Sequence, residues 1–183
     1  MAAKKSAETK TRPKKTADRI GPSTGGSDDI APSAPDGLEI ERIIVFSMEG
    51  QRYALPIDVV QEIQQIVAFS EIPDHQAAVV GVINVRGQVV PAVDLRLLVG
   101  MPAREYGLQT PMLFVRTAKG LVALIVDEVE DVTEVPPNSS QVPSRMYALA
   151  DKLLSVVRLD TDLVFVFDID RLVPAEAVGA GRG

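Results

Sequence analysis

Few residues of this chain have the type and spacing that catalysis requires. The one histidine, His75, follows a Pro-Asp loop, has no partner set by its spacing, and is expected on a surface loop. The absence of cysteine excludes a thiolate metal site and a cysteine nucleophile. Gly81 and Gly87 are not followed by the Lys and Ser/Thr of a phosphate-binding loop. We therefore predict that the protein is not an enzyme and binds no cofactor.

An acidic cluster after position 126 is a candidate cation site. It lacks the alternating loop ligands and the glycine of an EF-hand. Valines recur between its members, as expected for a solvated face above a buried one. We predict no metal site here. The cluster consists of Asp127, Glu128, Glu130, Asp131 and Glu134.

Arg86 is the residue whose type the local structure does not explain. It lies between two apolar runs, 82–85 and 89–95, and Gly87 after it can adopt the positive φ of a tight hairpin turn. Such a turn needs a glycine but not a permanent cation. Arginine forms bidentate bonds to carboxylates and is enriched in interfaces. We predict that Arg86 contacts a protein partner.

The composition indicates a soluble β-rich domain. Of the 183 residues, 46% are hydrophobic and only 4% aromatic, with no tryptophan. The core must therefore consist of Val, Ile, Leu and Ala, which favours strands and argues against a base-stacking surface. No apolar run reaches the roughly 18 residues that span a bilayer, and no signal-peptide core is present. A reducing compartment is compatible with the lack of cysteine.

The net charge of −6 is divided unevenly along the chain. Residues 1–19 carry seven cations against two anions, so a basic tail precedes an acidic body. Residues 1–38 have too few large apolar side chains to offset their ordering entropy, and we predict that they are disordered. This tail could be a solubilising spacer, a weak contact for nucleic acid or an anionic membrane, or a partner of the acidic body.

The apolar pattern predicts strands throughout the rest of the chain. A short helix or turn is expected at 57–66, where apolar residues recur at helical spacing, and a strand near 65–69. A linker is expected at 101–110 and a flexible tail at 175–183. The predicted strands cover 40–48, 52–55, 82–85, 89–95, 111–117, 121–126, 153–159 and 163–169.

The two halves of the chain resemble each other. When Ala54 is set against Ala123, apolar and acidic residues match without a gap, including Asp58 with Asp127, which we interpret as turn caps. Asp94 and Asp168 anchor a second set of matches. We predict a domain over 39–174 made of two similar β-barrels, the first mainly 40–100 and the second mainly 110–174. Each would be marginal alone, so we expect an apolar seam between them.

Several stretches, in collinear order over about residues 40–174, resemble a known family. The most specific is Gly81-Val82-Ile83-Asn84-Val85-Arg86-Gly87 followed by Val90-Pro91-Ala92-Val93-Asp94-Leu95-Arg96. It resembles the signature of CheW-like domains. The supporting stretches are Tyr53–Ile57, Val59–Ile63, Ala123–Val129 and Val164–Ile169.

This resemblance implies an all-β fold of two five-stranded SH3-like barrels and a non-enzymatic function. CheW-like proteins are adaptors that join the regulatory domain of the histidine kinase CheA to the cytoplasmic tips of chemoreceptors. The expected location is the cytoplasm, in chemoreceptor arrays. An alternative is a CheW-like scaffold of a non-flagellar pathway, such as gliding or pilus motility, that its tail tethers to nucleoid or membrane.

The resemblance also implies the partner-binding residues. By position in the motif, Arg86 and Gly81 correspond to coupling residues, Asn84 and Gly87 belong to the same signature, and Val60 and Glu62 lie where partner contacts are made. An apolar groove between the barrels would suit a receptor helix. The chain departs from the family pattern at Ala123, at Leu153-Leu154-Ser155-Val156, which lacks a usual glycine, and in its basic tail.

Overall fold

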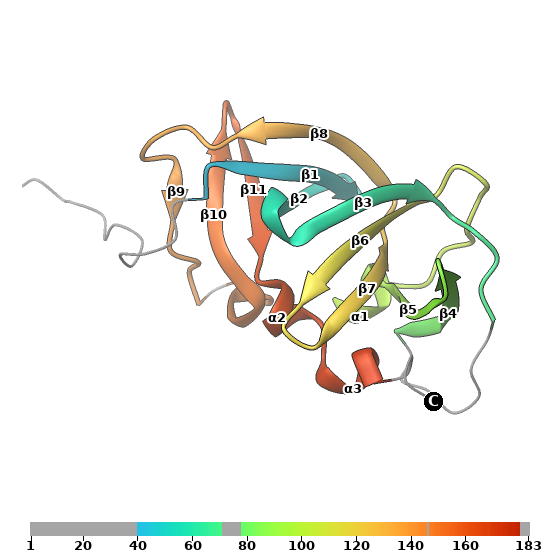
Figure 1. The fold of residues 1–183 in the computed structure, drawn as a ribbon. Coiled ribbons are helices and arrows are strands. Elements are labelled where there is room, and N and C mark those ends of the chain that lie inside the picture. The colour runs from blue at the N-terminus through green and yellow to red at the C-terminus, as the bar shows by residue number, and fades with distance from the viewer. Residues whose placement is uncertain (1–39, 71–77, 146, 180–183) are drawn as a thin grey trace, which may run out of the picture. The chain divides into compact units, whose positions relative to one another are not determined.

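The computed structural model describes residues 40–70, 78–145 and 147–179 of the chain (Figure 1). The fold is mainly β with short helices, as predicted. His75 and the predicted tail at 1–38 lie outside the described residues. In the part of the chain that the structure describes, no helix is long and apolar enough to cross a membrane.

The described strands form two sheets, one of six strands and one of five. We call them barrel A, with strand order β8-β1-β2-β11-β10-β9, and barrel B, with order β3-β6-β7-β5-β4. The predicted pair of five-stranded SH3-like barrels is confirmed, with the two-residue β9 added to barrel A. Barrel A contains β1 (Arg42–Met48), β2 (Gln51–Pro56), β8 (Glu128–Glu134), β9 (Ser140–Gln141), β10 (Leu153–Leu159) and β11 (Asp162–Phe167); barrel B contains β3 (Val60–Gln65), β4 (Val79–Val85), β5 (Gln88–Asp94), β6 (Pro111–Thr117) and β7 (Gly120–Ile125).

The prediction of a first barrel mainly from 40–100 and a second mainly from 110–174 misses an exchange of hairpins between the two halves. The β1–β2 hairpin of the first half pairs with β8 and β11 of the second half, and the β6–β7 hairpin pairs with β3 and β5 of the first half. Each barrel therefore combines the first hairpin of one half with the last three repeated strands of the other. Local sequence patterns predict strands but do not identify their partners, which explains the error.

The internal repeat itself is visible in the structure. At the spacing that sets Asp94 against Asp168, β4 coincides with β10 and helix α1 (Leu95–Leu98) with α2 (Ile169–Leu172). The parallel pairs also correspond, since Ala92 lies opposite Ala123 in barrel B and Val166 opposite Ala54 in barrel A. The two halves thus share one topology.

The core has three parts, and the strands of each first hairpin contribute to two of them. Ile43 and Val45 face the interior of barrel A, whereas Ile44, Phe46 and Met48 face a larger core shared by both barrels. Barrel B has its own interior around Phe114 and Met112. Strands buried on both faces read as continuous apolar runs. The shared core is the apolar seam that the sequence analysis predicts.

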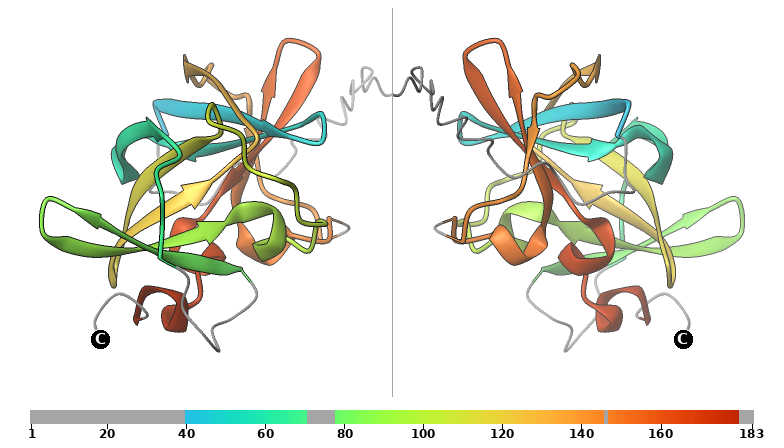
Figure 2. Two further views of the ribbon diagram at one scale, coloured as in Figure 1. Left: turned by 90° about the vertical axis from the view of Figure 1, so that its right-hand side faces the viewer. Right: turned by 90° about the vertical axis from the view of Figure 1, so that its left-hand side faces the viewer.

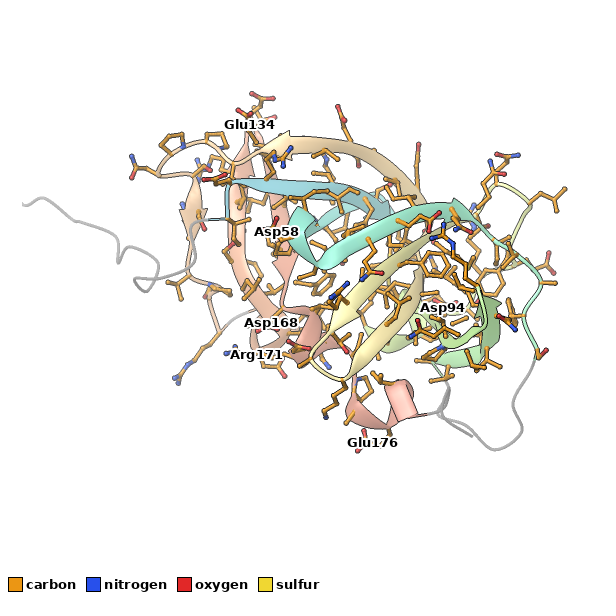
Figure 3. All side chains as sticks on the ribbon, in the orientation of Figure 1. Asp58, Asp94, Glu134, Asp168, Arg171 and Glu176 are labelled. Carbon is orange, nitrogen blue, oxygen red and sulfur yellow. The ribbon has the colours of Figure 1, made fainter. Side chains whose placement is uncertain are left out.

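Aspartates begin the two helices that follow the last strand of each repeat (Figure 3). The Asp94 carboxylate accepts hydrogen bonds from the backbone N–H groups of Arg96 and Leu97, and Asp168 does the same for α2. Both are N-caps, which stabilise helix starts. The predicted flexible tail at 175–183 is wrong in its first part, because α3 (Ala175–Gly179) buries Ala177 and Val178.

The helix or turn predicted for 57–66 is confined to one 3-10 turn, η1 (Ile57–Val59), before strand β3. Pairing of β3 with β6 overrides the helical spacing of its apolar residues. The strand expected near 65–69 is replaced by a bridge between Ser70 and Val82. A second 3-10 turn, η2 (Ala150–Lys152), precedes β10.

Candidate partner-binding surface

Arg86 lies at the tip of the β4–β5 hairpin, exposed to solvent, in a two-residue turn with Gly87. Both residues have positive φ, 53° for Arg86 and 86° for Gly87. A turn with both central residues in this region favours Asn-Gly, and for a residue with a Cβ the left-handed conformation costs about 1–2 kcal/mol. The sequence predicts the positive φ at Gly87 but not that at Arg86.

Asn84 stabilises this turn from within the hairpin. Its Oδ1 accepts a hydrogen bond from the Gly87 backbone N–H at 2.8 Å. Asn84 is exposed, so its side chain also forms part of the surface around Arg86. Of the residues predicted at this end, Asn84 and Gly87 therefore shape the turn, and Arg86 supplies the charge.

The corresponding turn of the second half carries the opposite charge. Asp160 between β10 and β11 has the same φ of 53° as Arg86. Aspartate tolerates this region better than arginine. Figure 2 shows the two hairpins, green for β4–β5 and orange-red for β10–β11, extending from different sides of the domain.

Gly81 is buried and leaves no room for a side chain. A Cβ at this position would lie 2.5 Å from the Ser70 carbonyl oxygen and 2.7 Å from Cδ2 of Phe69. The structure therefore places Gly81 beneath the segment at 69–70 and not on the surface around Arg86.

Val60 and Glu62 lie on β3, the outermost strand of barrel B, while Arg86 lies beyond β4 at the other end of the strand order. Val60 is half-buried and Glu62 is exposed. The predicted residues therefore lie on two different elements of barrel B, the β4–β5 hairpin tip and the β3 edge, which do not pair with each other in the sheet.

A groove of about 550 Å³ lies between β3 and the start of β8, where the two barrels adjoin. Ile63, 43% exposed, contributes apolar surface to it together with Pro111 and Val129. Arg104 and Asp127 line the groove as an ion pair with 3.6 Å between the charged atoms.

A buried ionic network joins the barrels, and the sequence analysis did not identify it. The Arg96 side chain, 6% exposed, donates from Nη1 to Asp127 Oδ2 at 2.7 Å and from Nε to the Pro102 carbonyl oxygen at 2.9 Å. Its Nη2 pairs with Glu49 in the β1–β2 turn. Asp127 is thus a partner of a buried arginine, and its Oδ2 also accepts a hydrogen bond from the Glu49 backbone N–H at 3.3 Å. It therefore binds the β1–β2 turn and not a turn of its own, as its interpretation as a local turn cap requires.

The network has a counterpart in the second half. Asp170 occupies the position equivalent to Arg96, and its Oδ1 accepts a hydrogen bond from the Ala118 backbone N–H at 2.7 Å in the β6–β7 turn. Each short helix therefore contacts the hairpin turn of the opposite barrel. The contact of the first helix is an ion pair between buried Arg96 and half-exposed Glu49, and that of the second is an exposed hydrogen bond, so the two contacts differ in charge.

Two ionisable side chains around this network have shifted pKa values. Burial alone would lower the pKa of Arg96, but the hydrogen bond and charge of Glu49 and the charge of Asp127 raise it overall. Burial raises the pKa of Tyr106, and so does its 2.6 Å hydrogen bond from Oη to Asp94. Both groups therefore keep their protons throughout the physiological pH range. Among the described residues, no group of three or more acidic or histidine side chains could hold a metal ion.

Comparison with known proteins extends these observations. Residues 42–177 match the model of the CheW-like domain. Chemotaxis protein CheW of Helicobacter pylori is 27% identical over 136 residues, which are 68% of this chain and 82% of that protein. Protein PilI of Pseudomonas aeruginosa is 29% identical over 120 residues, 64% of this chain and 67% of that protein. The crystal structure of scaffolding protein TtCheW from Thermoanaerobacter tengcongensis superposes with a TM-score of 0.70 at 25% identity, covering 75% of this chain and 97% of that one.

A non-enzymatic scaffold built from two barrels is the class of protein that these matches define. The chain belongs to the CheW-like domain family and is a coupling or scaffolding protein of the CheW type. The resemblance in the sequence and the predicted fold are both confirmed.

Proposed function

We propose that this protein couples the histidine kinase CheA to chemoreceptor tips, using the hairpin tip and the β3 edge as separate contact surfaces. The observation that carries the proposal is Arg86. Arg86 places a long, exposed cation at a backbone position where asparagine would be less strained. The backbone cost has no compensating contact in the hairpin, so an interaction with a partner explains the residue type best.

We assign the kinase contact to the β3 edge. Val60 and Glu62 lie on a strand whose outer edge has no strand beside it among the described residues. An open edge with a half-buried valine and an exposed carboxylate suits a β-rich partner that pairs edge to edge. The CheA regulatory domain, which resembles this chain, is such a partner.

We assign the receptor contact to the hairpin tip around Arg86. Arg86 would pair with a carboxylate on a receptor helix. The groove that Ile63 lines belongs to the β3 side of the domain and is not part of this contact. In this arrangement the protein acts on the cytoplasmic side of the membrane, within receptor arrays.

A binding experiment with both partners tests this assignment. Glu62→Lys should weaken binding to the kinase domain and leave receptor binding unchanged, while Arg86→Glu should do the reverse. Binding by calorimetry to each purified partner separates the two surfaces. Equal losses for both partners in both variants would contradict two separate surfaces.

The similarity to Protein PilI, which is not named as a chemotaxis protein, favours one alternative. In it, the protein is a CheW-like scaffold of a non-flagellar pathway, with its basic tail attached to nucleic acid or an anionic membrane. Affinity capture from the native cell identifies the kinase and receptor. Pull-down with DNA or anionic liposomes, with and without residues 1–38, tests the tail; no difference would make the tail a spacer.

A further inference from the structure

The two barrels differ at one equivalent place, the end covered by the segment before β4 in barrel B and by β9 in barrel A. In barrel B, Ser70 bridges to Val82. In barrel A, Gln141 pairs with Val156, the repeat equivalent of Val82. Ser140 therefore corresponds to Phe69 in the register of the covering segment.

In barrel B this end is filled by an aromatic ring. Phe69 packs on the barrel interior and lies directly over Gly81. Its ring also meets Tyr106 edge to face, with centroids 6.1 Å apart. Glycine beneath the ring is the residue type that this packing requires, because any Cβ would clash.

In barrel A the same place is open. Ser155, the repeat equivalent of Gly81, follows a bulge that matches the one before Gly81. With small Ser140 in place of the ring, a cavity of about 720 Å³ remains. Ile40 and Leu154, both packed against the barrel interior, form apolar parts of its wall.

Two polar features point to a ligand in this cavity. Ser155 is 3% exposed, and its hydroxyl has no hydrogen-bond partner among the described residues. Buried hydroxyls normally have a partner, so this one is left unsatisfied in the free protein. Arg145, Arg171 and Asp151 are the charged side chains among the described residues that line the cavity, and Arg171 also lies 3.1 Å from Asp168.

We propose that this cavity of barrel A binds a small aromatic carboxylate. The ring would occupy the volume that Phe69 fills in barrel B, and a polar substituent would reach the Ser155 hydroxyl. The carboxylate would pair with Arg145, because charge-assisted bonds to arginine are the strong ones and Arg171 already forms an ion pair with Asp168. The volume lies in the ordinary range of small-molecule sites, and the wall is mainly apolar with few polar groups, as such sites are.

Titration of the full chain with 3-phenylpropionate, followed by two-dimensional NMR of backbone amides, tests the proposal. We expect saturable shifts at β9 and around Ser155 and a midpoint of thermal unfolding that rises with probe concentration. The uncharged analogue 3-phenylpropanol should bind about tenfold more weakly. No saturable shift, shifts confined to barrel B, or equal affinity for both probes would overturn the proposal.

A filled-cavity variant provides the decisive comparison. Ser140→Phe should abolish binding without lowering the thermal midpoint, because it recreates the packing of barrel B. Gln141→Phe, on the same short strand but outside the cavity wall, should bind like the parent. If Ser140→Phe does not fold, Arg145→Gln is used, and about tenfold weaker binding of 3-phenylpropionate is expected. Unchanged affinity in whichever of these two cavity variants folds would contradict the site.

Discussion

At position 86 the turn conformation and partner binding favour different residue types. The turn favours asparagine at this position, and Asn84 already accepts the Gly87 N–H. An arginine there adds strain without adding a contact inside the hairpin. A substitution that relieves the strain and removes the charge therefore distinguishes the two roles.

We predict that Arg86→Asn keeps or raises the thermal stability of the protein while weakening receptor binding by about tenfold or more. Circular dichroism melting and calorimetric binding measure the two effects. Asp160→Asn at the equivalent turn is the matched control and should change neither. A variant that unfolds would show that Arg86 is structural, and unchanged binding would remove it from the interface.

For Arg96 we predict the opposite effect, a loss of stability, because its contacts lie inside the protein. We expect Arg96→Met to lower the free energy of unfolding by about 3 kcal/mol, since Asp127 would keep a buried charge without its main partner. Urea denaturation measures this. Arg52→Met removes a more exposed ion pair with Glu130 and should cost less than about 1 kcal/mol. Similar losses in both variants would mean that the Arg96 network adds little.

These two arginines show what the sequence can and cannot predict. Arg86 is identifiable because the turn around it is local, and a glycine next to an unexplained cation is visible in the sequence. The partners of Arg96 are Glu49 and Asp127, far away along the chain. Only the tertiary fold brings them together. The Asp94-Leu95-Arg96 signature was the available signal, but it does not name the partners.

At the scale of elements, Gly81 links the covering segment to the hairpin that ends in Arg86. We predict that Gly81→Val displaces the segment at 69–70 and destabilises the protein by about 1–3 kcal/mol, because the clash is with backbone. Faster hydrogen exchange at the Ser70 and Val82 amides, which bond to each other's carbonyls, would report the displacement. Any loss of partner binding in this variant would then be indirect.

Gly107 is the control for this substitution. It is exposed, a Cβ there would meet nothing within 4 Å, and its φ is outside the left-handed region. Gly107→Ala should therefore leave exchange and stability unchanged. Protected amides at Ser70 and Val82 in Gly81→Val would refute the steric explanation and restore a direct contact for Gly81.

The positions of the strands were easier to predict from the sequence than the pairing of those strands in the sheets. Alternation and glycine turns locate most strands, and the repeat predicts that the halves share a topology. The helical spacing at 57–66 wrongly predicted a helix where β3 lies. This strand is at the edge of barrel B, is exposed at most positions and pairs on one side only. An edge strand with little burial carries a weak pattern.

At the scale of the whole molecule, the exchange of first hairpins makes the two halves dependent on each other. Neither half contains a complete barrel, because β1 and β2 close barrel A while β6 and β7 close barrel B. The shared core draws residues from both barrels as well. The domain should therefore unfold as one cooperative unit, although its sequence reads as two repeats.

Cleavage of the chain between the repeats tests this dependence. A protease site inserted between Gly107 and Leu108, which is 86% exposed, allows the folded protein to be cut without disturbing a strand. We predict that the two pieces stay associated after cleavage, and that each piece purified alone shows little β-structure by circular dichroism. Mixing the pieces should restore the β signal, with a rate that depends on concentration. Two independently folded halves would instead match a barrel for each half, and would contradict the hairpin exchange that positions Arg96 against Glu49.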